Sequence, residues 1–168
     1  PAAVPAPIVV LCPSAPWMRI DPEYDPRRVA LAKMGFAVVE FNGRGASGFG
    51  KQFRNRVLDG YEVAQARDIV SLIDRLSQDY KVNPEKVAIM GEWLGGFLAL
   101  RTVQLHPERF RCVISVDAPL NPLRWMNKER WTEGVLERSA LEADLIRQYM
   151  GTEEHLKKAP LVHNPESL

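Results

Sequence analysis

The chain has 168 residues, of which 46% are hydrophobic and 26% are charged, as in an ordinary globular domain. Its 22 basic and 21 acidic residues leave a net charge of +1, which gives no electrostatic basis for binding nucleic acid or an anionic membrane. The apolar runs are far shorter than the roughly 20 residues that span a bilayer. We therefore expect no nucleic acid and no membrane as partner.

The first quarter of the chain alternates apolar runs with loops. Pro1–Pro7 is proline-rich and aperiodic, which is typical of a linker. Ile8–Leu11 is wholly apolar, as in a buried parallel strand. Arg27–Met34 predicts a short helix that Gly35 closes, and Phe36–Phe41 predicts a second buried strand.

A glycine-rich loop, Asn42–Gly50, follows the second strand. A Walker loop would continue with Lys-Ser or Lys-Thr, but Lys51 and Gln52 stand there, and the spacing of a dinucleotide site is also missing. We therefore predict no phosphate-bearing cofactor, and no cofactor or metal of any other kind.

The rest of the chain continues the alternation of helices and strands. We predict a helix over Tyr61–Tyr80, a strand over Lys86–Met90, a helix that ends near His106 and a buried strand over Phe110–Val116. This order predicts an α/β fold with a mostly parallel, doubly wound sheet. Residues 122–150 are mixed, with aromatic anchors at Trp125, Trp131 and Tyr149 and a helix over Ser139–Met150. The tail from Gly151 is polar.

The sequence "MGEWLGG", residues 90–96, stands between the third predicted strand and its helix. A strand that ends in Gly-x-x-x-Gly and turns at once into a helix is typical of the nucleophile elbow of α/β-hydrolases. The middle position of that elbow carries a nucleophile, usually Ser. Here it is Trp93.

Several motifs of the chain belong together. In chain order they are "KMGFAVVEFNGRGASGFG", "VNPEKVAIMGEWLGGFLAL", "HPERFRCVISVDAP" and "YMGTEEHLKKAPLVH". They closely resemble the catalytic domain of the prolyl oligopeptidase family of serine peptidases, in its acylaminoacyl-peptidase-like and dipeptidyl-peptidase-like branch. The resemblance implies an α/β-hydrolase domain over residues 8–168, truncated at its C-terminal end, with residues 1–7 as a linker.

A serine peptidase needs a nucleophile, a His, an acid and donors for the oxyanion. The resemblance places the nucleophile at Trp93, whose indole is a donor only, and one oxyanion donor at the backbone N–H of Leu94. The family's His-Gly-Gly-Pro loop corresponds to Cys12, Pro13 and Ser14, where Pro13 has no N–H. We expect this oxyanion loop to be degraded and no intact catalytic residue to remain.

The resemblance places the catalytic Asp and His beyond Leu168, and the three histidines of the chain do not replace them. His106 ends a helix, and His163 matches a position that is not catalytic in the family. His155 lies in a polar stretch that we expect to be exposed.

Other residues offer less specific chemistry. Cys12 stands at the carboxyl end of a strand, where ligands bind in open α/β sheets, but no base is identifiable beside it, and we expect both Cys12 and Cys112 to be buried free thiols. Glu92 and Asp117 also end strands and could work as an acid–base pair, or could form salt bridges with Arg44 or another Arg. Arg44, Glu92, Trp93 and Asp117 are thus the candidate pocket residues.

The sequence leaves two functions open. One is a catalytically degenerate hydrolase domain that serves as a scaffold or binding module, with Trp93 either plugging the old cleft or forming the floor of a site for a peptide or small ligand. The alternative is an active peptidase or esterase whose nucleophile was changed and whose Asp and His lie outside this chain. In either case Phe110–Val116 would form a bare apolar edge, so we expect a further domain or protein chain to cover it.

Overall fold

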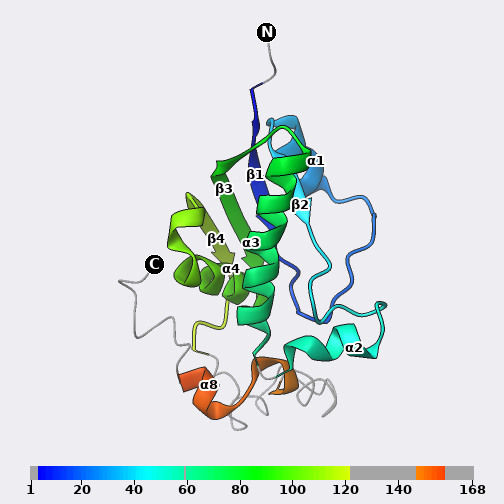
Figure 1. Ribbon diagram of the computed structural model, residues 1–168, viewed down its shortest axis with the longest axis vertical. Helices are drawn as coiled ribbons and strands as arrows, with labels where there is room; N and C mark the ends of the chain where they lie inside the picture. The colour runs from blue at the N-terminus through cyan, green and yellow to red at the C-terminus, as the bar shows by residue number, and fades with distance from the viewer. Residues whose placement is uncertain (1–3, 59, 122–146, 158–168) are drawn as a thin grey trace.

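The computed structural model describes residues 4–58, 60–121 and 147–157. Its centre is a sheet of four strands in the order β2-β1-β3-β4, and every pairing is parallel (Figure 1). The strands are β1 (Ala6–Leu11), β2 (Ala37–Glu40), β3 (Val82–Glu92) and β4 (Cys112–Val116). The helices are α1 (Pro26–Lys33), α2 (Lys51–Arg54), α3 (Tyr61–Asp79), α4 (Leu94–Leu105) and α8 (Glu153–Lys157), with 3-10 turns η1 (Asn55–Val57) and η2 (Pro107–Arg109).

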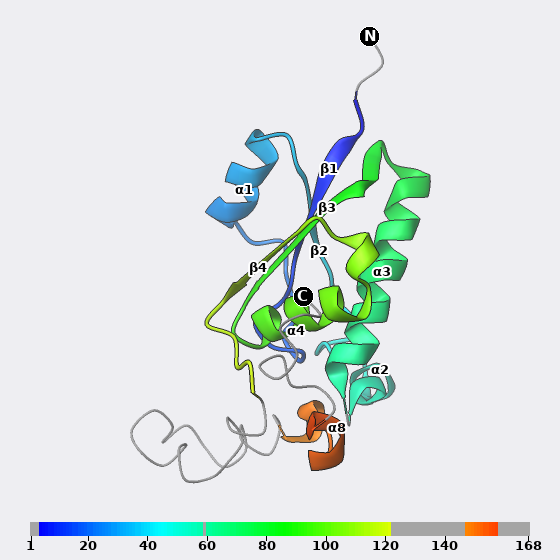
Figure 2. The same cartoon turned by 90° about the vertical axis from the view of Figure 1, so that its left-hand side faces the viewer.

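Helices cover the two faces of the sheet unequally. Figure 2 shows α1 on one face, and α3 with α4 on the other. The chain passes from β1 to β2 along one direction of the sheet and then returns past β1 to β3 and β4. This is the doubly wound α/β arrangement that the sequence predicted, and its switch point lies between β1 and β3.

The core lies between the sheet and the pair α3 and α4. In α3 the buried apolar residues are Ala66, Ile69 and Ile73, spaced three and four apart as in one face of a helix. In α4 the whole first half, Leu94–Ala99, is buried. A helical stretch that is apolar on every side belongs inside a domain, and α4 packs against β3, β4 and α3.

The two central strands are longer than the sequence predicted. β1 begins at Ala6, inside the predicted linker, because the Ala6 N–H donates to the carbonyl of Lys81 at 3.0 Å. β3 begins at Val82 instead of Lys86. It pairs with β1 along two stretches, and the register of the pairing shifts between Pro7 and Ile8 of β1. Apolar runs therefore marked the buried middle of each strand but not its ends.

The two edge strands are less buried than predicted. No residue of β2 is fully buried, and β4 alternates between exposed and half-buried residues. Cys112 is exposed, which corrects the prediction that both cysteines are buried, while Cys12 is buried as expected. Ile114 and Val116 are 47% and 50% exposed. An edge strand has one neighbour, so an apolar run alone does not determine its burial.

The later part of the chain is described over residues 147–157 only. The predicted helix Ser139–Met150 is observed where it overlaps that range, because residues 147–150 are helical. Trp125 and Trp131 lie outside the described residues. The polar tail contains a helix that the sequence did not predict, α8. Within the described ranges, no helix has the length and apolarity needed to cross a bilayer.

Candidate functional site

The carboxyl ends of β1 and β3 meet at the switch point of the sheet. β1 ends at Leu11 and β3 at Glu92, and the two strands pair up to Leu11 and Met90. Cys12 therefore follows β1 beside the end of β3, with its N–H bonded to the Met90 carbonyl, and Trp93 follows β3 at the same edge of the sheet. In open α/β sheets this crevice is where ligands bind.

Trp93 occupies a sharp turn between β3 and α4. Its φ is +55° and its ψ is −120°, a left-handed backbone that is costly for a bulky residue. The Trp93 N–H donates to the carbonyl of Val116 at 2.9 Å, and its own carbonyl accepts from the Phe97 N–H at 3.0 Å. A sharp, strained turn from strand to helix is what a nucleophile elbow requires at this position.

Three glycines make the turn sterically possible. A Cβ at Gly91 would lie 2.2 Å from the carbonyl oxygen of Gly95. A Cβ at Gly95 would lie 2.4 Å from the carbonyl oxygen of Pro13, and one at Gly96 would lie 2.8 Å from the Oγ of Ser115. The motif thus places glycines, which have no side chain, where β3, α4 and the loop after β1 approach one another closely.

Leu94 begins α4 directly behind the elbow. Its side chain is buried, and its carbonyl accepts a hydrogen bond from the buried Tyr61 hydroxyl at 2.9 Å. Its N–H lies in the first turn of the helix, where amides have no acceptor within the helix. An N–H at this position is left for an acceptor outside the helix, as an oxyanion donor would need.

The loop after β1 presents carbonyl groups to the elbow. The Cys12 N–H is used in the sheet, since it donates to the Met90 carbonyl at 2.8 Å, and Pro13 has no N–H. The carbonyl oxygens of Cys12 and Pro13 lie 3.0 and 2.4 Å from the Cβ position of Gly95. Ser14 is half-buried in the same loop. A carbonyl repels an oxyanion, so neither Cys12 nor Pro13 supplies the second donor of such a hole.

Cys12 is not suited to act as a nucleophile. It is 9% exposed, and burial raises the pKa of its thiol far above the ordinary value. A thiol reacts as its thiolate, and apolar burial suppresses that form. Cys12 therefore serves at this strand end as a core-packing residue.

Arg44 is bound to α3 and not to the carboxylates at the strand ends. Its guanidinium forms an ion pair with Asp68 at 2.7 Å and donates to the Ala64 carbonyl at 2.8 Å. The backbone N–H of Arg44 donates to the same Asp68 carboxylate at 3.0 Å. These bonds hold the Asn42–Gly50 loop against α3.

Glu92 and Asp117 lie at the ends of neighbouring strands. Both residues are exposed, and Asp117 has a φ of +51°. The hydrogen bond from Trp93 to Val116 holds the two strand ends together. The structure therefore brings Glu92, Trp93, Leu94 and Asp117 to one edge, whereas the guanidinium of Arg44 is directed to α3.

Comparison with known families matches residues 22–162 to the prolyl oligopeptidase family. The chain belongs to this family. Dipeptidyl aminopeptidase BIII of Pseudoxanthomonas mexicana is 31% identical over 120 residues, which are 71% of this chain and 17% of that protein. The acylamino-acid-releasing enzyme of Mus musculus is 25% identical over 138 residues, which are 81% of this chain and 19% of that protein. The chain thus spans less than a fifth of the length of these relatives.

Solved structures of other proteins show that the fold is that of the α/β-hydrolases. A puromycin-hydrolyzing peptidase of Mycobacterium tuberculosis superposes with a TM-score of 0.84 at 19% identity, covering 99% of this chain and 24% of that one. The acylaminoacyl peptidase of Pyrococcus horikoshii gives 0.78 at 18% identity, covering 97% of this chain and 26% of that one. At these identities the likeness concerns the fold alone.

This prolyl oligopeptidase domain also contains buried polar contacts that the sequence did not reveal. The Gln65 amide donates to the Arg44 carbonyl at 2.7 Å and to the Pro16 carbonyl at 3.3 Å. The Tyr149 hydroxyl donates to the Gly45 carbonyl at 2.9 Å. Gln65 thus joins two loops to α3, and Tyr149 joins the Asn42–Gly50 loop to the helical residues 147–150. Because they bond to backbone carbonyls, which every residue carries, no residue pairing in the sequence marks them.

The histidines differ in their surroundings. We expected His155 to be exposed, but its side chain is only 27% exposed, and its Nε2 lies 2.6 Å from the Oε1 of Glu62. His106 caps the far end of α4, and His163 lies outside the described residues. In the ranges that the structure describes, no three His, Cys, Asp or Glu side chains are grouped as a metal site would require.

Proposed function

We propose that this prolyl oligopeptidase domain is catalytically degenerate and serves as a scaffold or binding module. The observation that carries the proposal is Trp93 at the tip of the elbow, with the backbone angles of a nucleophile position. An indole has one N–H donor and no group that attacks a carbonyl. The side chain is half-buried and packs against the core, which supports a plug in the old cleft.

The loop after β1 supports the same proposal independently. An oxyanion needs N–H donors, but the Cys12 N–H is bonded to the Met90 carbonyl and Pro13 has no N–H. One substitution of a nucleophile would leave that loop intact. Two altered parts of one site therefore favour loss of the chemistry over a single introduced change.

The alternative is an active peptidase or esterase whose nucleophile was changed and whose Asp and His lie outside these 168 residues. The relatives that resemble this chain bear the names of peptidases, so the ancestral reaction we propose is peptide hydrolysis. A peptide or small ligand in the cleft beside Trp93 is compatible with either function.

A serine-reactive fluorophosphonate probe distinguishes these functions. We expect no labelling of the wild-type chain and no hydrolysis of aminoacyl-nitroanilide or ester substrates above buffer. Trp93→Ser should remain unlabelled, because His155 is paired with Glu62 and His106 lies at the far end of a 12-residue helix, about 18 Å from the elbow.

Trp93→Ala is the matched control, since it empties the same space without adding a hydroxyl. Both functions expect background labelling of these 168 residues alone, so the two variants are also compared in the full-length product of the gene, where background labelling of both would support the degenerate domain. Stoichiometric labelling of Trp93→Ser but not of Trp93→Ala would show that a working base reaches the elbow, and would favour the alternative.

We further propose that another segment or a second polypeptide covers the free face of β4. Ser115 faces α4, because its Oγ lies 2.8 Å from the Cβ position of Gly96. Strand side chains alternate, so the exposed set Cys112, Ile114 and Val116 faces the opposite side. On that face α1 packs near β2, at the opposite edge of the sheet from β4 (Figure 2). An exposed apolar strand at a sheet edge is a common site of association.

Thiol labelling combined with light scattering tests this cover. We expect Cys112 to react slowly in the wild type and rapidly in Ile114→Asp. A mass above that of one chain that falls in Ile114→Asp would identify the cover as a second polypeptide, and a wild-type monomer with slowly reacting Cys112 would identify it as another segment. Tyr80→Asp is the matched control, since Tyr80 is 65% exposed at the end of α3 and outside this face. Cys12 should stay unreactive in the folded chain. A wild-type monomer with rapidly labelled Cys112 would contradict the proposal.

A further inference from the structure

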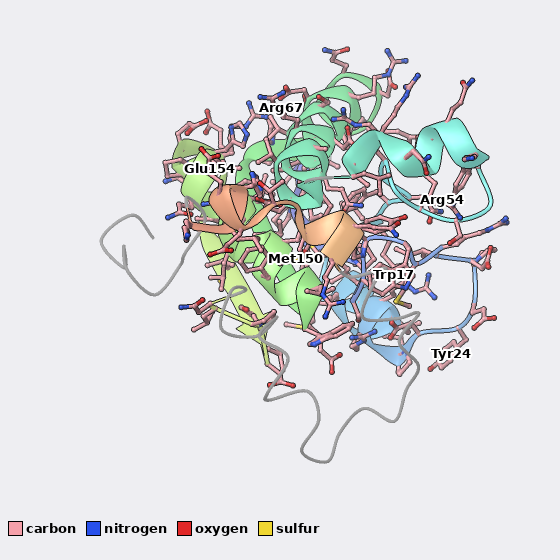
Figure 3. All side chains as sticks on the ribbon, turned by 90° about the horizontal axis from the view of Figure 1, so that it is seen from below. Trp17, Tyr24, Arg54, Arg67, Met150 and Glu154 are labelled. Carbon is pink, nitrogen blue, oxygen red and sulfur yellow. The ribbon has the colours of Figure 1, made fainter. Side chains whose placement is uncertain are left out.

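Residues 147–157, which we call the strap, pack across the end of the molecule where the strands terminate. Tyr149, Met150 and Leu156 are almost completely buried there. The Tyr149 carbonyl accepts a hydrogen bond from the Gly60 N–H at 3.2 Å, just before α3. Figure 3 looks onto this end: Met150 lies near its middle, while Glu154, Arg67 and Arg54 lie towards its rim. The strap is therefore part of the packed structure.

One polar contact joins the strap to the first turn of α3. The Nε2 of His155 lies 2.6 Å from the Oε1 of Glu62, and the Glu62 side chain is fully buried. Gly60 makes room for the imidazole, because a Cβ there would lie 2.9 Å from His155 Nε2. The backbone before α3 is thus shaped to receive this ring.

Glu62 is a buried carboxylate with few partners. Its Oε2 has no hydrogen-bond partner, and neither has the Nε of the buried Arg101 on α4. Arg101 directs its Nη1 to Gln104 and interacts with Glu62 through charge. Burial, with the charge of Glu62 as a smaller cause, raises the pKa of the neighbouring Tyr61 well above its ordinary value. His155 is therefore the side chain that hydrogen-bonds to this charge in the described part of the chain.

We propose that His155 and Glu62 form a pH-sensitive latch that fastens the strap to α3. A buried carboxylate is stabilised by an adjacent imidazolium far more than by a neutral imidazole. The latch is closed at a pH low enough to protonate the imidazole, and it weakens as the pH rises and the proton is lost. Release would also loosen the Asn42–Gly50 loop, since Tyr149 of the strap donates to the Gly45 carbonyl.

Several other ionisable groups surround the latch. Glu62 contacts His155 from α3. Tyr61 precedes Glu62 in the same helix, and Arg101 of α4 interacts with Glu62 through charge. The strap itself carries Arg147, Glu154 and the solvent-exposed pair Glu153–Lys157, at 2.8 Å. Among these residue types, only histidine ordinarily changes charge between pH 5 and 8.

Hydrogen exchange of the full chain, followed by mass spectrometry at pH 5.5 and pH 8.5, tests the latch. After correction for intrinsic exchange rates, we expect the protection of the strap to fall roughly tenfold at the higher pH, as for a change of one pKa unit. Protection of β1 and β3 should not change. Equal corrected protection of the strap at both pH values would overturn the proposal.

Variants identify the groups responsible. Glu62→Gln and His155→Gln should each abolish the pH dependence of the strap, whereas the control His106→Gln should retain it. If Glu62→Gln fails to fold, His155→Gln carries the same test, because that side chain reaches solvent. A pH dependence that persists in His155→Gln would assign the effect to another group and refute the latch.

Discussion

Gly95→Ala should lower the free energy of unfolding by about 2–3 kcal/mol. The added methyl group would lie 2.4 Å from the Pro13 carbonyl oxygen and 3.0 Å from that of Cys12. Both obstacles are backbone atoms, so no change of rotamer relieves the clash. Alanine favours a helix over glycine by about 1 kcal/mol, which offsets only part of this cost.

Urea unfolding of wild type and variant measures the difference. Gly35→Ala is the matched control, because a Cβ at Gly35 would meet nothing within 4 Å although its φ is +92°. That control should cost about 1 kcal/mol through backbone strain alone. If Gly95→Ala were no worse than Gly35→Ala, the loop after β1 would not be packed against the elbow as described.

Tyr149→Ala should cost about 3–5 kcal/mol, the range for deleting a buried aromatic ring. Tyr149 is 1% exposed, and its ring packs edge-on against Trp17 with centroids 5.4 Å apart. The variant removes this packing together with the hydroxyl bond to Gly45. It should therefore detach the strap from the loops around the elbow.

Tyr149→Phe separates the two contributions, since it removes only the hydroxyl and should cost about 1–2 kcal/mol. Urea unfolding at pH 5.5 gives both values where the latch is closed. The cost of Tyr149→Ala should shrink at pH 8.5 if the strap already opens there. A loss below about 1 kcal/mol at pH 5.5 would mean that the strap contributes little to the folded state.

The elbow and the order of the elements could be predicted from the sequence for a physical reason. Gly91, Gly95 and Gly96 are required where backbones approach within van der Waals contact, and that requirement is local to one turn. Ile8–Leu11 was predicted because a strand between two neighbours is apolar on both faces. Such signals need no knowledge of distant residues.

The remaining features depend on contacts between residues far apart in the chain. Arg44 could have paired with several carboxylates, and only the packing of α3 places Asp68 beside it. His155 and Glu62 stand in separate polar stretches, so nothing in either stretch indicates a buried pair. The exposure of Cys112 depends on the position of β4 at the edge of the sheet. Sequence patterns indicate which element forms, but not what stands beside it.

The central position of β1 affects how the chain emerges during synthesis. β1 pairs on one side with β2 and on the other with β3, so that Ile8 lies beside Val87. At about 5–20 residues per second, the ribosome needs on the order of 10 s to deliver β3 after β1. Throughout that interval the wholly apolar run Ile8–Leu11 has an open edge. This apolar run therefore stays open to other chains until β3 has been made, and in that interval it offers a binding segment to a chaperone that recognises short apolar stretches.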